Sequence, residues 1–440
     1  ISNSLLFQFF YILLTYTEMS FFYSQTLKTQ TLDPSSDIKN SKTRFRFAED
    51  TAYYPNIRLA NVGSLGSASH SYNRIAGVLA SIRHIRLTSN GVELDACRFA
   101  NRFMAFQALT NDNSQNCSVN RNLVKNAIGY QVKASTGAVA SPNVPSTAND
   151  GSTNSQKQKS LGHIDLRRVL PLLEQMPILD TAVFKNLILE IEWETDPRNL
   201  IVVGNIPQTV QTPMLIAEEI IRPGLRESLT AGFKGAVWNK IEHDVVGVAD
   251  NSSAVTYNTD VVNQTTQHKF SAFDDKHISR MVIMKSFSDK SKYVDTNAVA
   301  GYGDFGSLAV HGESIQIKLN GGNVFPQHLD KQSTRDMMTY DSWGKLNTIP
   351  YGTLESVGLD VEGNARLNIS GAPVGTATSQ AKEVGGQSFF GFSLNAKVGE
   401  IGINYVRTTI KNDLTSAPEK DALDIHVYAE VRKQLVLGKN

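Results

Sequence analysis

A strand that runs into an Asn-Gly turn occurs twice in this chain of 440 residues, once in each half. The first copy is IRLTSNG at residues 85–91, and the second is IQIKLNG at residues 315–321. Asn-Gly favours a tight turn between antiparallel strands, because both residues adopt positive φ at low cost. A second pair of strand-like segments, residues 214–220 and 426–431, follows in the same order. The chain is therefore predicted to contain one β-rich domain built twice in tandem.

Length and charge limit the possible functions. The chain is long enough for two or three domains with complete hydrophobic cores. Its formal net charge of +1 argues against a protein that coats nucleic acid, and no specific nucleic-acid site is evident. The two cysteines, Cys97 and Cys117, form neither a disulfide framework nor a metal-ligand cluster. We expect both to be reduced thiols in a protein that folds inside the cell.

An apolar segment precedes the first methionine, Met19. Residues 4–16 are shorter than the roughly 20 residues of a membrane-spanning helix, and they lack the basic start of a secretory signal. We interpret residues 1–18 as translated upstream sequence, with a membrane-associated segment as the alternative. Residues 19–42 are rich in Ser, Thr, Asn and Lys, so residues 1–43 are predicted to form an N-terminal arm.

The first β-domain is predicted to cover residues 44–222. It begins with alternating arginine and phenylalanine at residues 44–47, which places the phenylalanines on one face of a strand. The arginines on the other face would meet solvent, or else a polyanion or a neighbouring subunit. Residues 184–195 form the clearest strand, with glutamates on one face. Its apolar face consists of Leu187, Leu189, Ile191 and Trp193.

Each Asn-Gly turn is followed by a segment with helical character. In the first half Asp95 is a candidate N-cap, and in the second half Asp330 or Ser333 takes that place. The first helix would carry an aromatic stripe typical of core packing, Phe99, Phe103 and Phe106. Residues 166–173 predict helical turns that are interrupted at Pro171.

The dipeptide Pro223-Gly224 is the predicted boundary, so the second β-domain covers residues 223–440. The strands expected there are residues 240–248, 278–285, 314–319, 389–394, 401–407 and 424–437. Residues 134–160 form a low-complexity run that predicts a long surface loop. Many short strands with few helices predict an all-β protein made of β-sandwiches.

The sequence carries no local signature of catalysis. Nine histidines are scattered without HxH or HExxH spacing, so we interpret them as structural residues. Residues 301–306 match GxGxxG by letters, but no βαβ unit surrounds them. The adjacent acids Asp274-Asp275 and Glu218-Glu219 would point to opposite faces of a strand, which excludes an acid–base pair. We therefore predict no enzyme activity, no catalytic residues, no cofactor and no metal site.

The order of these segments resembles the double jelly-roll major capsid proteins of double-stranded DNA viruses. Similar proteins are those of polinton-like viruses and virophages, with adenovirus hexon as a more distant relative. The resemblance rests on residues 314–321 with the following Val324-Phe325-Pro326, on residues 166–173 before 184–195, and on residues 424–437. It implies two tandem eight-stranded jelly-roll β-sandwiches with short helices inserted in loops.

The resemblance also implies a function in assembly. Three chains around a threefold axis would present six sandwiches as a pseudo-hexagonal capsomer that tiles an icosahedral shell. Residues 134–160 would form an outward tower loop, and residues 19–42 would be an interior arm. The expected partners are the other chains of a homotrimer, neighbouring capsomers, and penton and minor capsid proteins. The protein would be made and assembled in the host cell and reside in the virion, and an internal membrane is not predicted.

Two other functions stay open. A jelly-roll enzyme or a lectin-like or cupin-like binding protein would need converging His and carboxylate ligands or an aromatic platform for sugars. A non-viral structural or adhesion sandwich would be secreted, and the sequence shows neither a signal nor a disulfide framework.

Overall fold

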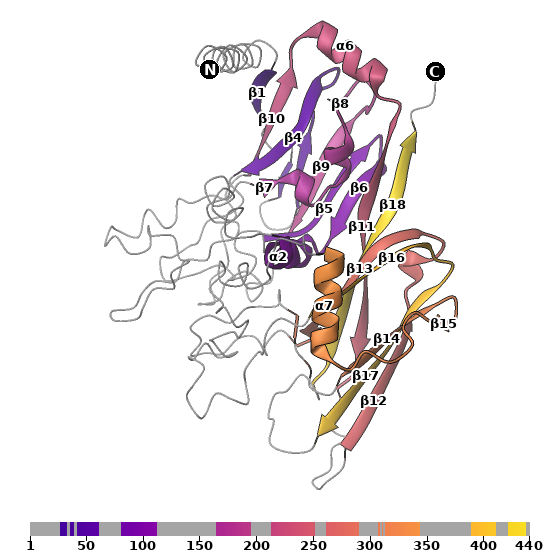
Figure 1. Cartoon of the computed structure of the whole chain (residues 1–440). Coiled ribbons are helices and arrows are strands. Elements are labelled where there is room, and N and C mark those ends of the chain that lie inside the picture. The colour runs from indigo at the N-terminus through magenta and orange to yellow at the C-terminus, as the bar shows by residue number, and fades with distance from the viewer. Residues whose placement is uncertain are drawn as a thin grey trace, which may run out of the picture.

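The computed structural model describes residues 27–32, 36–38, 42–60, 81–111, 164–194, 213–250, 261–289, 307–308, 310, 313–343, 389–410 and 421–436. Over these residues the chain forms four antiparallel sheets, and Figure 1 shows them as two stacked sandwiches. The first sandwich lies at the top of that view and the second below it. The all-β prediction is confirmed.

The first sandwich consists of strands β1 to β10. One sheet has the order β1 (Leu27–Leu32), β10 (Met214–Ile220), β4 (Ala52–Ala60) and β7 (Ile164–Asp165), with β8 (Leu179–Asp180) also paired to β4. The other has the order β2 (Ser36–Ile38), β3 (Lys42–Arg46), β9 (Leu187–Trp193), β5 (Ile82–Ser89) and β6 (Val92–Arg98). As the alternation in β3 and β9 predicts, Phe45, Leu189 and Ile191 are buried between the sheets.

The second sandwich consists of strands β11 to β18 in two four-stranded sheets. One has the order β11 (Gly235–Val248), β18 (Leu423–Val436), β13 (His277–Phe287) and β16 (Phe390–Lys397). The other has the order β12 (Val261–Lys269), β17 (Ile401–Ile410), β14 (Ser314–Leu319) and β15 (Gly322–Asn323). In this sandwich most of β13 and the middle of β18 are buried on both faces.

The duplicated turn is present in both halves. Asn90 and Gly91 have φ of 49° and 77°, and Asn320 and Gly321 have φ of 50° and 80°. Positive φ at both central residues defines the tight hairpin turn that Asn-Gly favours. A helix follows each hairpin, α2 (Ala100–Asn111) in the first half and α7 (Gln332–Trp343) in the second. The prediction of one plan used twice is confirmed.

The predicted helix caps are wrong. Asp95 lies inside β6, because this strand continues past the turn and pairs with β5. Its buried carboxylate instead accepts hydrogen bonds from the backbone N–H of Ala96 and of Leu172, the first residue of α4 (Leu172–Gln175). Asp95 therefore satisfies a helix N-terminus that is distant in sequence. In the second half α7 begins at Gln332, so Ser333 lies within its first turn and Asp330 lies before it.

Three other predictions concern the N-terminal arm, the domain boundary and the interruption at Pro171. We expected residues 1–43 to form an arm, but β1 pairs with β10, so the first sandwich reaches nearer to the N-terminus than residue 44. The dipeptide Pro223-Gly224 begins a linking helix, α6 (Pro223–Gly232), and the domain boundary at residues 222 and 223 stays a prediction. Pro171 separates the 3-10 turn η3 (Leu166–Arg168) from α4, as expected.

Several predicted segments lie outside the described residues: 1–18, 134–160, 301–306 and Cys117. Cys97 is a free, buried thiol in β6. A further 3-10 turn, η5 (Ser271–Phe273), precedes β13. No helix among the described residues is both long enough and apolar enough to span a membrane.

Candidate functional site: the junction of the sandwiches and a charged sheet face

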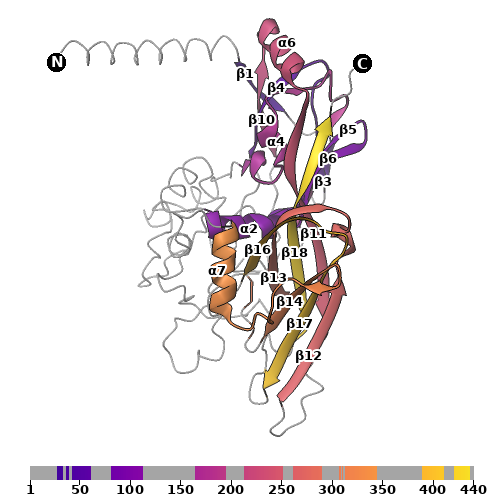
Figure 2. The same cartoon turned by 45° about the vertical axis from the view of Figure 1, so that its right-hand side comes forward.

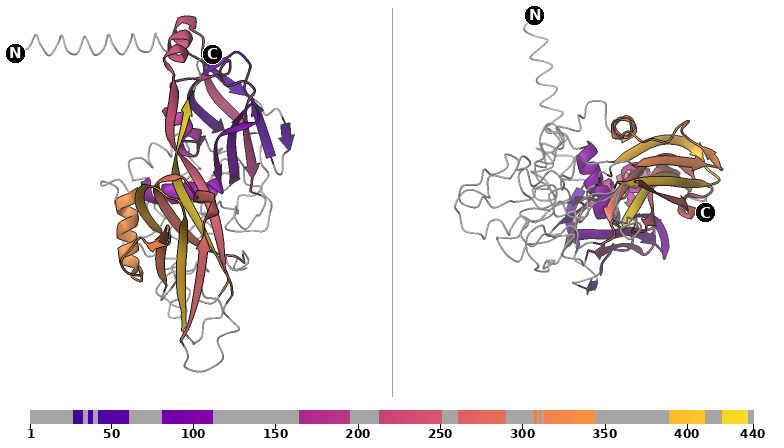
Figure 3. Two further views of the ribbon diagram at one scale, coloured as in Figure 1. Left: turned by 90° about the vertical axis from the view of Figure 1, so that its right-hand side faces the viewer. Right: turned by 90° about the horizontal axis from the view of Figure 1, so that it is seen from below.

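Two long strands tie the second sandwich to the first. Strands β11 and β18 pair along their whole length, from Gly235 facing Val436 to Val248 facing Leu423. Strand β13 pairs with β18 only as far as Val431, so the rest of the β11–β18 pair continues as a two-stranded ribbon. In the left panel of Figure 3 this ribbon, with β18 in yellow, rises from the lower sandwich alongside the upper one.

One side of the ribbon enters the core of the first sandwich. Ala236 and Trp238 of β11 are each 7% exposed and belong to the same hydrophobic cluster as the first sandwich's own core. Further along β11, the ammonium group of Lys240 donates to Glu93 Oε1 of β6 in the first sandwich at 2.6 Å. The ribbon is therefore a packed connection between the sandwiches and restricts their relative motion.

A group of rings from both sandwiches closes the junction. Phe99, between β6 and α2, contacts the rings of His84 (5.0 Å), His243 (4.9 Å) and His426 (5.5 Å). A ring nitrogen of His243 lies 3.0 Å from one of His426. The hydroxyl of Tyr428 donates to the carbonyl of Phe99 at 2.9 Å. We call these five residues the histidine junction.

The backbone at the histidine junction is constrained. Phe99 has a φ of 48°, which is uncommon for a bulky residue and persists only when surrounding contacts hold it. Its N–H donates to Nδ1 of His84 at 2.9 Å, and its carbonyl is held by Tyr428 of the other sandwich. One residue is thus held by both sandwiches.

Burial favours the neutral form of two of these imidazoles, His84 and His243. It lowers the pKa of His243 to about 3, and the charge of Arg102 adds to the effect. Burial also lowers the pKa of His84, although Glu192 opposes that shift. Sequence reasoning treated the histidines as scattered, and it missed that β5, β11 and β18 bring three of them together. Within the ranges given above, no group of His, Cys, Asp or Glu is placed to hold a metal ion.

The two inserted helices also meet at this junction. Figure 2 shows α2 lying across the upper end of α7. The ring of Trp343 in α7 lies 6.0 Å from that of Phe103 and 5.2 Å from that of Phe106, both in α2. Phe106 also contacts Phe389, at 5.1 Å. Phe103 and Phe106 of the predicted aromatic stripe are therefore core residues, as expected, but part of the core they enter belongs to the other sandwich.

An ion pair locks α7 onto the second sandwich. Arg280 of β13 donates twice to the carboxylate of Glu430 in β18, with both distances 2.7 Å. The same guanidinium lies 4.1 Å above the ring of Trp343, a cation–π contact, and it donates to the carbonyl of Ser342. Arg280 therefore connects two strands and a helix.

A fully buried ionic group holds the other end of α7. The carboxylate of Glu313 is 0% exposed and accepts hydrogen bonds from Lys285, from Arg335 at 2.8 Å and from the hydroxyl of Tyr405 at 3.1 Å. Burial raises the pKa of Tyr405, and the charge of Glu313 adds to the shift. Because these groups are shut off from solvent, they serve packing and cannot reach a substrate.

The outer face of the first sandwich carries alternating charges. In the register of its sheet, Glu190 of β9 lies between Arg44 of β3 and Arg86 of β5. It forms ion pairs with them at 2.6 and 2.7 Å, and Lys42 lies 3.9 Å away. Burial alone would raise the pKa of Glu190, but the hydrogen bond from Arg44 and the charge of Arg86 lower it overall. Cross-strand register thus builds this network.

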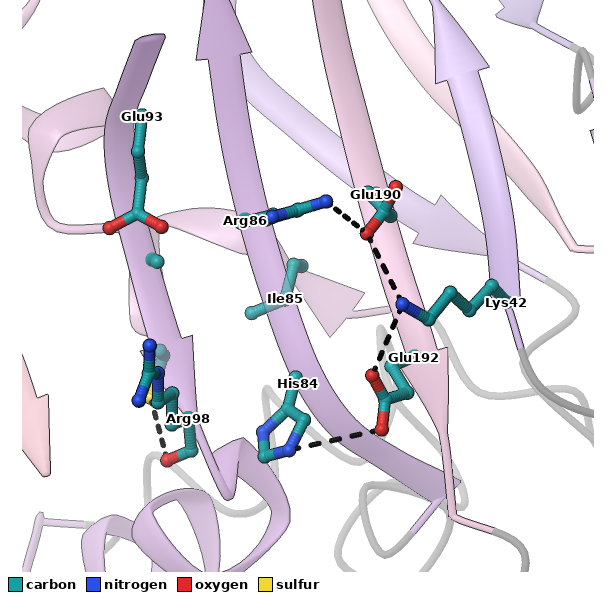
Figure 4. Close-up of a pocket in the computed structure, with 10 residues that line it drawn as sticks. Lys42, His84, Ile85, Arg86, Glu93, Arg98, Glu190 and Glu192 are labelled. Atoms are coloured by element: carbon teal, nitrogen blue, oxygen red, sulfur yellow. Dashed lines mark hydrogen bonds and ion pairs between the residues drawn. The ribbon is translucent and has the colours of Figure 1, made fainter. Parts of the chain in front are cut away.

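A shallow pocket opens on this face where Ala96 carries only a methyl group. Figure 4 shows Arg86 and Lys42 on either side of Glu190, and Glu192 between Lys42 and His84. The pocket has a volume of about 140 Å³. Its charged lining can exchange ion pairs with another protein surface, and the thiol of Cys97 beside it has its pKa raised by burial. Such a thiol is a poor nucleophile.

The adjacent acids are engaged in ordinary surface contacts. Asp274 lies 3.5 Å from the ammonium group of Lys269, and Glu219 accepts a hydrogen bond from Gln30 of β1. Glu218 and Glu219 follow each other in β10, where neighbouring side chains point to opposite faces. These contacts give no reason to assign either pair a catalytic role.

Comparison with known proteins was made by sequence and by structure. No family model matches the sequence, and no curated protein matches it. Among solved structures, the Faustovirus major capsid protein has a TM-score of 0.53 and the mavirus major capsid protein 0.52, each at 10% identity over 94% of this chain and 90% of theirs. The capsid of PBCV-1 virus has a TM-score of 0.50 at 10% identity, over 94% of this chain and 97% of the other. At this identity the likeness establishes the fold: the chain adopts the double jelly-roll fold of these viral capsid proteins.

Proposed function

We propose that this chain is the major capsid protein of a DNA virus. The observation that carries the proposal is the pair of jelly rolls held together within one chain by the ribbon, the histidine junction and the α2–α7 contact. Two sandwiches in a fixed arrangement supply one third of a six-part ring, so three chains complete a pseudo-hexagonal capsomer. The solved structures of this fold named above are themselves capsid proteins.

The charged outer face of the first sandwich supports self-assembly. Its glutamates and basic side chains alternate along neighbouring strands. A second surface with alternating charges could therefore form ion pairs with both its acidic and its basic groups. The net charge of +1 also lets many copies pack closely with little mutual repulsion. We infer that the partners are two further copies in a homotrimer, then neighbouring capsomers, with penton and minor capsid proteins completing the virion.

The proposed role is structural and involves no catalysis. The titratable groups with the largest perturbations, such as His243, Asp95 and Tyr405, are buried in packing contacts and face no substrate cleft. Perturbed groups of this kind are accounted for by the fold, so they do not call for an active site.

Multi-angle light scattering and negative-stain microscopy test the proposal. The full chain and a version that starts at Met19 are expected to run with the mass of three protomers at micromolar concentration. Microscopy should show hexagonal blocks. A stable monomer without such blocks would overturn the capsid assignment. A charge reversal on the sheet face, Arg86→Glu, should lower the trimer fraction. Lys269→Glu, at an exposed lysine in β12 of the second sandwich that pairs with Asp274 and Glu400, serves as the control away from this face.

A further inference from the structure

Two hydrogen bonds of the histidine junction depend on the protonation state of its imidazoles. The N–H of Phe99 donates to Nδ1 of His84 at 2.9 Å, so this nitrogen must carry no proton. Between His243 and His426, 3.0 Å apart, one ring nitrogen donates and the other accepts. If both rings were protonated, all their nitrogens would be donors and the bond would be lost. Protonation of Nδ1 of His84 therefore removes its bond to Phe99, and protonation of both His243 and His426 removes the bond between them.

The charges around the junction are mostly positive. Glu192 faces His84 at 3.9 Å, and Glu430, on the same face of β18 as His426, is already bound by Arg280. The cations that act on the junction come from β3, β5, β6 and α2, and they are Lys42, Arg83, Arg98 and Arg102. A new positive charge there meets repulsion and finds little compensation.

We propose that the histidine junction is an acid-sensitive joint, which holds the two sandwiches together while its imidazoles are neutral and opens when they take up protons. The inference goes beyond the proposed function, because it rests on the junction alone and applies to a single chain. In a capsomer, the same joint would convert acidification into a looser subunit.

The sign and the size of the effect follow from linkage. Burial depresses the pKa of His243 from 6.5 to about 3, so the opened state binds the proton more tightly than the closed state. The stabilisation by neutral His243 is complete above about pH 6.5 and is lost as the pH falls toward 3. Each pH unit below 6.5 raises the opening constant about tenfold, which predicts about 30-fold at pH 5.0 from His243 alone.

Hydrogen–deuterium exchange measured by mass spectrometry on the full chain tests the joint. Exchange at pH 7.5 and pH 5.0 is corrected for the intrinsic chemical rate, and the same measurement on Asp95→Asn removes the neighbouring carboxyl group that titrates in this range. Peptides that cover residues 96–106 are expected to open at least tenfold more often at pH 5.0. Peptides from β12 (Val261–Lys269), away from the junction, should change less than threefold. Equal opening of residues 96–106 at the two pH values would overturn the proposal.

A matched set of variants identifies the groups responsible. The double substitution His243→Phe with His426→Phe removes the paired imidazoles, and the acid response of residues 96–106 should become at least threefold smaller. His268→Phe replaces a histidine of β12 that contacts Phe270, and it should leave the response unchanged. A double variant with the full wild-type response would refute the joint. If that variant does not fold, the wild-type exchange decides alone. Light scattering at pH 7.5 tests the capsid function separately, because a monomeric mass would contradict that function and leave the proposed joint unaffected.

Discussion

Phe106→Ala tests whether the two sandwiches are energetically coupled. The Phe106 side chain is 0% exposed and lies in α2 of the first half, while its ring partners Trp343 and Phe389 belong to the second. Truncation of a buried phenylalanine costs about 3–5 kcal/mol of unfolding free energy. Two ring pairs across the junction, at about 0.5–1.5 kcal/mol each, make about 1–3 kcal/mol of this cost coupling between the sandwiches. We therefore expect unfolding of the variant to lose cooperativity.

Urea unfolding followed by hydrogen exchange measures this coupling. In the wild-type chain, peptides from β9 and β17 should lose protection together. In the Phe106→Ala variant the two midpoints should separate, and the total unfolding free energy should fall by about 3–5 kcal/mol. Phe273→Ala is the matched control, because this ring is also 0% exposed but its aromatic partner Phe270 lies in the same sandwich. If Phe106→Ala costs less than about 1 kcal/mol, or the two midpoints separate no more than in the control, the α2–α7 contact does not couple the sandwiches.

Three further predictions concern single residues. Arg280→Ala leaves Glu430 largely buried without its bidentate partner, and thermal or urea unfolding should show a loss of about 3–5 kcal/mol; a loss below about 1 kcal/mol would contradict the assigned role. Gly91→Ala places a side chain at a φ of 77° with open space around it, so backbone strain alone should cost about 1–2 kcal/mol, whereas Gly224→Ala at ordinary φ should cost less than about 0.5 kcal/mol. Burial raises the pKa of Asp95 to about 7. The stabilisation of the folded state by protonated Asp95 is therefore complete below about pH 4 and is lost as the pH rises through 7. Asp95→Asn should remove this pH dependence from the unfolding free energy measured by urea titration.

Much of the fold follows from patterns of short range. The Asn-Gly turns, the alternation in β3 and β9, and the interruption at Pro171 all depend on neighbouring residues, and each prediction is confirmed. Strand β12 was missed because its residues, VVNQTTQHK, are mostly polar. It lies at the edge of its sheet, where pairing with β17 does not require a run of apolar side chains.

The candidate site depends on contacts that the sequence does not encode locally. In β18 the alternation of residues 425–431 indicates one buried face, yet His426 and Tyr428 on the other face are also buried. That second face is covered by Phe99, which is 329 residues away from Tyr428 along the chain. The same holds for Asp95, whose neighbours suggest a cap for the following helix while the fold uses it to cap α4. A polar residue in a buried strand position indicates that it has a hydrogen-bond partner, but the sequence does not show which residue that partner is.

The joining of two jelly rolls in one chain has a physical consequence for assembly. A ring of six separate sandwiches needs five association steps, each with a cost in translational and rotational entropy of several kcal/mol. Three double subunits need two such steps, because the α6 link makes three of the contacts intramolecular. With the α6 link alone, the two sandwiches of one chain could rotate relative to each other. Assembly would then have to freeze that rotation, at an additional cost in entropy. The ribbon, the α2–α7 stack and the strained, doubly held Phe99 fix the arrangement before any partner arrives. The repeated turn therefore accounts for two sandwiches, and in the proposed capsomer the junction between them would make each chain a rigid third of a hexagon.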